Sequence, residues 1–85
     1  HVYIVECSDG SLYTGVAKDL DARIVLHNSG KGAKYTRSRL PVNLVYAETA
    51  ANQSAALQRE YAIKQLKRSD KKSLINNSEY VDFAD

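Results

Sequence analysis

The stretch VYIVECSDGSLYTG, residues 2–15, decides the fold of this 85-residue chain. Its two ends are rich in β-branched, aromatic and aliphatic residues, which favour strands, and Ser8-Asp9-Gly10-Ser11 between them has the composition of a turn. The stretch therefore predicts a β-hairpin. Because side chains alternate along a strand, we expect Tyr3 and Tyr13 on neighbouring strands with both side chains on one face.

The rest of the chain predicts a small α+β domain built on this hairpin. Apolar periodicity and capping residues indicate a helix, a third strand and two further helices. We expect one domain over residues 1–85, with a three-stranded, mainly antiparallel sheet flanked by three helices. The predicted elements are a helix capped by Asp19 and ended by Gly30, a strand over residues 43–48, a helix from residue 53 or 54 to 67 or 68, and a short helix capped by Asp70.

Charge is unevenly distributed along the chain. Residues 1–78 hold 12 bases against 7 acids, and the other three acids form an acidic tail within residues 78–85. No acid lies between Ala22 and Ala47. Such a local field suits a polyanion, although a solvated surface is the simpler interpretation. The side chains that we expect to contact nucleic acid are Lys18, Lys31, Lys34, Tyr35, Arg37 and Arg39, most of them in a predicted loop between Gly30 and Pro41.

Composition excludes several classes of protein. No apolar stretch approaches the roughly 20 residues that span a bilayer, so we expect no membrane segment. The lone Cys7 cannot form an internal disulfide, which indicates a reducing cytoplasm. Clustered His and Cys ligands, a Walker-type loop and a Ser-His-Asp arrangement are not evident.

Five side chains make chemical sense as one site, although each alone has an ordinary interpretation. Tyr3 and Tyr13 suit a half-buried strand, Arg23 and His27 suit a helix surface, and Glu60 precedes a lysine by four residues, a favourable helix pair. Together they suit phosphodiester cleavage: a carboxylate holds one hard cation, an arginine takes phosphate charge and a phenol accepts a proton from water. Ionising a phenol at neutral pH costs roughly 4 kcal/mol, which a nearby positive charge must supply.

In Val2-Tyr3-Ile4, Tyr13-Thr14-Gly15 and Lys18-Asp19-Leu20-x-x-Arg23, the chain resembles the GIY-YIG nuclease domain over nearly its whole length. It looks most like small stand-alone bacterial members of that superfamily, related to the N-terminal nuclease domain of the repair protein UvrC. The resemblance implies the same fold and the activity of a divalent-metal-dependent DNA endonuclease. It also implies Mg²⁺ or Mn²⁺ as the cofactor and a role in repair or DNA processing. It assigns catalytic positions to Tyr3, Tyr13, Arg23 and His27, and the metal-binding position to Glu60.

The chain departs from the family pattern at three places. Val2 replaces a glycine, and Val16 stands where the repair nuclease has a lysine near its second tyrosine, which leaves open whether Lys18 takes its place. The family's C-terminal asparagine has Asn76 and Asn77 as candidates by position. Relatives that cut specific sites carry additional DNA-binding domains, so a protein partner for targeting is compatible with the sequence.

Several alternatives stay open at the level of sequence. The main one is a non-catalytic or partner-dependent nucleic-acid-binding module on the same fold, and a third is an adaptor that uses the acidic tail. The general base is either Tyr13 or Tyr3. The substrate is DNA, branched or single-stranded forms included, and RNA is not excluded.

Overall fold

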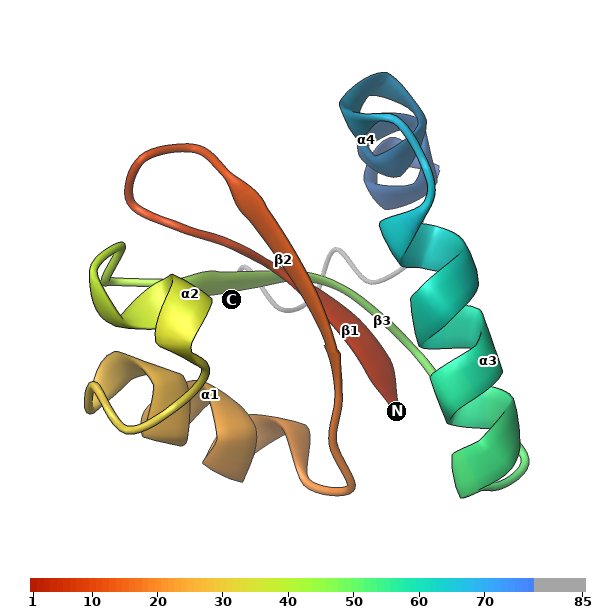
Figure 1. Cartoon of the computed structure of the whole chain (residues 1–85), viewed down its shortest axis with the longest axis horizontal. Coiled ribbons are helices and arrows are strands. Elements are labelled where there is room, and N and C mark those ends of the chain that lie inside the picture. Colours follow the sequence, from red (N-terminus) through yellow and green to blue (C-terminus); the bar gives the residue numbers. More distant parts are fainter. Residues whose placement is uncertain (78–85) are drawn as a thin grey trace.

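The computed structural model describes residues 1–77, so the predicted acidic tail lies outside the described residues. Its three strands form one antiparallel sheet in the order β2-β1-β3 (Figure 1), which confirms the predicted fold class. Among the helices of residues 1–77, none has the length and apolar character that a membrane span requires. The elements are β1 (Val2–Glu6), β2 (Leu12–Val16), α1 (Leu20–Asn28), α2 (Lys34–Arg37), β3 (Asn43–Glu48), α3 (Gln53–Lys64) and α4 (Arg68–Asn76).

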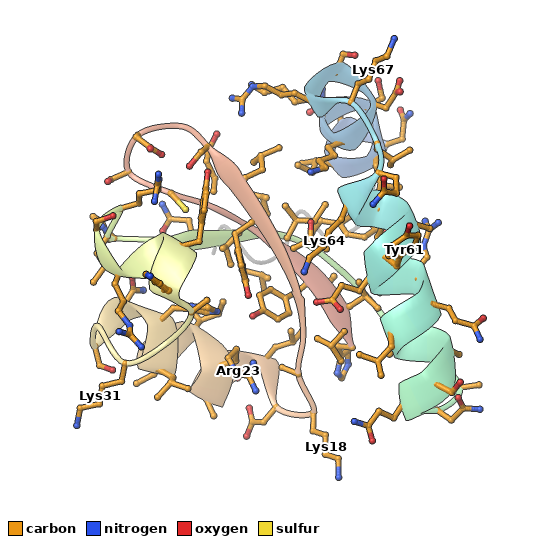
Figure 2. The ribbon with its side chains drawn as sticks, in the orientation of Figure 1. Lys18, Arg23, Lys31, Tyr61, Lys64 and Lys67 are labelled. Atoms are coloured by element: carbon orange, nitrogen blue, oxygen red, sulfur yellow. The ribbon has the colours of Figure 1, made fainter. Side chains whose placement is uncertain are left out.

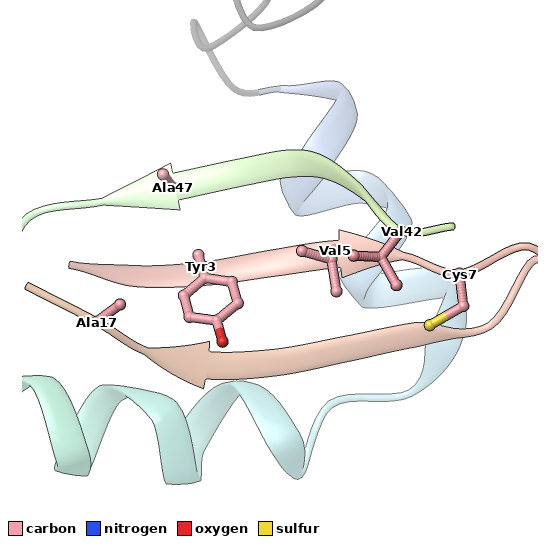
Figure 3. Packing of buried hydrophobic residues seen from close by; sticks show 6 residues of the cluster. All are labelled: Tyr3, Val5, Cys7, Ala17, Val42 and Ala47. Atoms are coloured by element: carbon pink, nitrogen blue, oxygen red, sulfur yellow. The ribbon is translucent and has the colours of Figure 1, made fainter. Parts of the chain in front are cut away.

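The central strand β1 pairs with a neighbour along each edge, and it is buried on both faces because an apolar cluster packs on each side of the sheet. Because side chains alternate along a strand, those of β1 belong in turn to two apolar clusters, one on each face of the sheet. Figure 3 shows the first cluster, to which α1 adds Leu20 and Ile24, whereas the second lies under α3 and α4. The first cluster holds Tyr3, Val5, Cys7, Ala17, Val42 and Ala47, and the second holds Val2, Ile4, Tyr46, Ala56 and Ile63.

The starts of α1 and α3 follow local capping chemistry. The Asp19 carboxylate accepts a hydrogen bond from the Ala22 N–H at 3.0 Å, as its position before the apolar run predicts. Asn52 caps α3 in the same way through the Ala55 N–H at 2.8 Å. Gly30, with φ of +82°, follows the end of α1, which confirms the predicted stop.

Two helix predictions were wrong. The predicted loop after Gly30 contains the short helix α2, so the described residues hold four helices instead of three. The predicted long helix ends at Lys64, and α4 begins at Arg68 with Lys67, instead of Asp70, at the N-cap. This break lets α4 turn back and pack Leu74 and Ile75 on the same cluster as α3. The periodicity of apolar side chains does not reveal this break, because the apolar residues of both helices pack on the same cluster.

Candidate active site

The two motif tyrosines lie on the same face of adjacent strands, as the hairpin pattern predicts. Tyr3 is opposite Gly15, and Val5 is opposite Tyr13, so the tyrosines are diagonal neighbours. Their surroundings differ: the Tyr3 side chain is fully buried, whereas Tyr13 on the outer strand is partly exposed. The pair therefore combines one inaccessible phenol with one that solvent reaches.

Gly15 makes room for the Tyr3 ring. A Cβ atom at Gly15 would lie 2.5 Å from the Tyr3 Oη and 2.7 Å from its Cζ, much closer than carbon atoms pack. Residue 15 must therefore lack a side chain for Tyr3 to cross β2. This close approach, and not a turn, explains the glycine of the Tyr13-Thr14-Gly15 motif.

His27 connects the buried tyrosine to α1. Its Nε2 lies 2.8 Å from the Tyr3 Oη and its Nδ1 lies 3.0 Å from the Thr36 Oγ1. The imidazole also meets the rings of Tyr3 and Tyr13 edge to face, with centroids 6.0 and 5.6 Å apart. Burial, and then the positive charge of Arg23, lower the pKa of His27, so its ring is neutral at pH 7.

The Tyr3 phenol is held in its protonated form. Burial raises the pKa of Tyr3, and the neighbouring Tyr13 raises it further. Hydrogen bonding and charge from Arg23 act in the opposite direction on that pKa but are smaller influences. A protonated phenol donates to Nε2 of His27 where that nitrogen carries no proton, so the direction of this hydrogen bond follows the tautomer of the ring.

Arg23 lies one helical turn before His27 and beside the tyrosines. Its Nη1 donates to the Val16 carbonyl oxygen at 3.3 Å, which holds the guanidinium against the end of β2. The side chain also lines an open hollow of about 750 Å³ between the first turns of α1 and α3. Of the five predicted catalytic and metal residues, Arg23 alone lines this hollow. The hollow therefore adjoins the cluster of Tyr3, Tyr13 and His27, here called the tyrosine cluster, without containing it.

Glu60 and Lys64 approach the same place from α3. They form an i,i+4 ion pair with Nζ and Oε2 3.4 Å apart, as their spacing predicts. The Lys64 Nζ lies 6.0 Å from the centroid of the Tyr13 ring. Figure 2 shows Arg23 of α1 and Lys64 of α3 directed toward β2 from opposite sides. The Glu60 carboxylate is also close enough to raise the pKa of Tyr3 slightly.

The site provides one carboxylate, that of Glu60, as a ligand for a metal ion. Within residues 1–77, no three His, Cys, Asp or Glu side chains lie together in a way that would hold one. Mg²⁺ commonly keeps several water ligands and uses one or two carboxylates with substrate phosphates. The Glu60 side chain, 21% exposed and beside the tyrosine cluster, fits that role.

The predicted nucleic-acid residues divide into two groups. Lys18, Lys31, Lys34 and Arg37 are exposed, and Figure 2 shows Lys18 and Lys31 at the periphery. Tyr35, although 40% exposed, stacks on Tyr13 with ring centroids 6.0 Å apart. The Arg39 guanidinium lies 4.0 Å from the Tyr35 ring centroid and pairs with Asp9 at 3.1 Å. Tyr35 and Arg39 are therefore engaged within the protein.

The two asparagine candidates lie at the end of α4. Asn76 is its last residue and Asn77 its C-cap, and both are exposed. Neither side chain makes a hydrogen bond to the tyrosine cluster within the described part of the chain. Their position gives no structural support for a place in the site.

Two residues at the site were missing from the sequence prediction. The sequence predicts Lys64 only as a helix partner of Glu60, because its distance from Tyr13 depends on how α3 packs against β2. The sequence predicts a loop around Thr36, whereas its contact with His27 depends on α2. The spacing from Glu60 is a usable signal for Lys64, whereas no local pattern points to Thr36.

Known proteins are similar to this chain over most of its length. A UPF0213 protein of Staphylococcus epidermidis is 61% identical over 74 residues, 87% of this chain and 90% of that protein. One from Staphylococcus saprophyticus is 57% identical over 76 residues, 89% of this chain and 93% of that protein. The solution NMR structure of a UPF0213 protein from Bacillus halodurans is similar with a TM-score of 0.61 and 44% identity, covering 98% of this chain and 89% of that one. The model of the GIY-YIG catalytic domain matches residues 1–74, and the chain therefore belongs to the GIY-YIG family, together with these UPF0213 proteins.

Proposed function

We propose that this chain is a divalent-metal-dependent endonuclease that hydrolyses phosphodiester bonds in DNA. The family is one of nucleases, and the observation that carries the proposal is the convergence of Arg23, Glu60 and Lys64 on the Tyr3–Tyr13 pair. Two cations, one carboxylate and an accessible phenol suit the charges of a phosphate, a metal and an attacking water. Action in repair or DNA processing, and a cytoplasmic location, are part of the same proposal.

Glu60 would hold Mg²⁺ or Mn²⁺, with water and substrate phosphate completing the coordination. A bound cation would supply Lewis-acid stabilisation of the phosphate oxygens. The Glu60 carboxylate pairs with Lys64 at 3.4 Å, so Glu60 would exchange part of that contact to hold the cation.

Tyr13 is the better candidate for the general base. Tyr3 is fully buried and its hydroxyl is committed to His27, so water does not reach it in this conformation. Tyr13 is partly exposed, so an attacking water can reach it, and the Lys64 ammonium lies 6.0 Å from its ring centroid. Lys64 thus supplies the positive charge that Val16 does not.

Arg23 would stabilise the negative charge that develops on the phosphate. Its guanidinium is fixed by the Val16 carbonyl and lies on the wall of the adjoining hollow. A fixed donor of this kind costs little reorganisation when the transition-state charge appears. Tyr3 and His27, packed behind Arg23, would then position it without touching the substrate.

Exposed bases on two sides of the tyrosine cluster support binding to a nucleic-acid backbone. Lys31, Lys34 and Arg37 are exposed on and before α2, and a second group lies at the other side of β2, from the end of α3 into α4. Contacts of this kind grip phosphates without reading sequence. The second group, which the sequence prediction did not include, is Lys64, Lys67, Arg68 and Lys72, of which Arg68 also donates to the Gly10 carbonyl oxygen at 2.7 Å.

The test is cleavage of supercoiled, single-stranded and branched DNA, and of RNA, with Mg²⁺ or Mn²⁺ and with a chelator. Glu60→Ala and Arg23→Ala serve as variants, each checked for folding by circular dichroism. We expect metal-dependent cleavage of DNA by the natural sequence and a loss of at least about a hundredfold in both variants. Cleavage that either variant leaves unchanged would point to a contaminating nuclease and contradict the proposal.

The same assay distinguishes a non-catalytic binding module on this fold. Such a module would bind DNA with a steep salt dependence, retain binding in Glu60→Ala and give no cut product with any substrate or metal. Preferential cleavage of RNA would instead keep the proposed chemistry and change the substrate.

A further inference from the structure

The hydrogen bonds of Tyr3, His27 and Thr36 form a continuous buried chain. The Tyr3 Oη contacts His27 Nε2 at 2.8 Å, and His27 Nδ1 contacts the Thr36 Oγ1 at 3.0 Å. The Thr36 hydroxyl continues to the Ala33 carbonyl oxygen at 2.9 Å. Tyr3, His27 and Thr36 are 0%, 1% and 0% exposed, so this chain is closed to water.

The acceptor at the end of this hydrogen-bond chain, the Ala33 carbonyl oxygen, determines the position of each proton along it. A carbonyl oxygen only accepts, so the Thr36 hydroxyl donates its single proton to Ala33 and offers lone pairs to His27. His27 Nδ1 must then carry the ring proton, and Nε2 of the neutral ring is left as the acceptor for the Tyr3 hydroxyl. The opposite arrangement would break the bond between the Thr36 hydroxyl and Ala33.

Tight packing holds Thr36 in this place. The turn of α2, which starts from Ala33, brings Thr36 back onto the imidazole. Gly32 lies so close to His27 that a Cβ atom there would be 2.9 Å from the His27 Cα and would also collide with Nδ1. The segment from Gly32 to Thr36 therefore fits around His27 and leaves little freedom for ring rotation.

We propose that Thr36 is a positioning residue that keeps His27 in the Nδ1–H tautomer and thereby directs the Tyr3 hydroxyl proton away from Arg23. With that proton on the His27 side, the lone pairs of the Tyr3 oxygen are left for Arg23, whose hydrogen bonding and charge lower the pKa of Tyr3. In the other tautomer Nε2–H would donate to Tyr3, and the phenol proton would turn toward a cation. Only the expected effect on cleavage rests on the proposed function; the tautomer claim stands on the buried geometry.

The experiment uses long-range ¹H–¹⁵N NMR spectra of the imidazole rings at neutral pH, in which protonated and unprotonated ring nitrogens have widely separated shifts. His1, the other histidine of the chain, is exposed and serves as an internal reference. The variants are Thr36→Val, which removes the acceptor for Nδ1–H, and Thr36→Ser, which keeps it. Thr14→Val is the matched control, because this buried hydroxyl has no hydrogen-bond partner within residues 1–77.

We expect His27 to be the Nδ1–H tautomer in the natural sequence, in Thr36→Ser and in Thr14→Val, and to shift toward Nε2–H in Thr36→Val. An Nε2–H tautomer in the natural sequence would overturn the proposal at once, even if Thr36→Val does not fold. An unchanged Nδ1–H signature in folded Thr36→Val would overturn it as well.

Cleavage gives the second readout. Thr36→Val should lose at least about tenfold in single-turnover rate, because small displacements of a catalytic group cost up to about a hundredfold, and Thr36→Ser should restore the rate. Expected tautomers together with an inactive natural protein would support the role of Thr36 at His27 and contradict the nuclease proposal.

Discussion

Tyr3 and Tyr13 are the same residue type on the same face of one hairpin, yet they lie in opposite environments. Tyr3 belongs to the central strand β1 and is covered by α1 and the glycine of the neighbouring strand, whereas Tyr13 belongs to the edge strand β2 and is partly exposed. Position in the sheet, and not residue type, thus separates a phenol that organises the site from one that meets solvent. The buried phenol connects to His27 and Thr36, and the exposed one faces Lys64.

Gly15→Ala should have the largest effect, because it breaks the burial of Tyr3. Its new methyl group would lie 2.5 Å from the Tyr3 Oη, and overpacking of this kind costs about 1–3 kcal/mol in the free energy of unfolding. Urea denaturation measures the loss.

The coupling to Tyr3 is tested in a double-mutant cycle with Tyr3→Leu, whose side chain lacks the colliding atoms. We expect Gly15→Ala to cost much less in the Tyr3→Leu background. An equal cost in both backgrounds would mean that Gly15 serves something other than the Tyr3 ring.

Lys64→Met sharpens the comparison from the Tyr13 side. A unit charge at 6 Å contributes about 0.7 kcal/mol in water and about 3 kcal/mol at an effective dielectric constant near 20. Because the Lys64 side chain is 46% exposed, we expect an intermediate effect, about a tenfold lower single-turnover cleavage rate. Lys67→Met, three residues later and also exposed, makes the same charge change and should lower the rate much less. Equal rates for the two variants would contradict a specific role of Lys64 at Tyr13.

Acid should destabilise the protein through His27, the smallest of these effects. The folded-state pKa of His27 is depressed below its unfolded value of about 6.5, because burial and Arg23 disfavour the charged ring. The stability from the neutral ring is therefore fully present above pH of about 6.5 and is lost as the pH falls through the folded pKa. Denaturation at several pH values should show this loss, and His27→Gln should weaken it. An identical pH dependence in both proteins would contradict the depressed pKa.

Much of the architecture follows from local sequence. Alternation in residues 2–15 predicts the hairpin and the shared face of its tyrosines, Asp19 and Gly30 mark the ends of α1, and spacing predicts the Glu60–Lys64 pair. The depth of each tyrosine does not follow, because it depends on β3 pairing with β1 from about 40 residues away.

The contacts around His27 were also beyond local patterns. Thr36 reaches the ring through a four-residue helix in a segment with no apolar periodicity, and Gly32 matters only because of a tertiary approach. The sequence likewise predicts a nucleic-acid contact for Tyr35 but gives no sign that Tyr13 and Arg39 contact its ring. Such contacts are set by the packing of distant elements.

The most direct test of the proposed division between the two tyrosines compares Tyr13→Phe with Tyr3→Phe in single-turnover cleavage of DNA, each corrected for its folded fraction. Tyr13→Phe should lower the rate by about a hundredfold or more with little change in stability, because it removes the proton acceptor. Tyr3→Phe should lose about 1–3 kcal/mol of stability, because His27 is left without its donor, and should reduce the rate less than Tyr13→Phe does. A larger rate loss in Tyr3→Phe than in Tyr13→Phe would contradict the account.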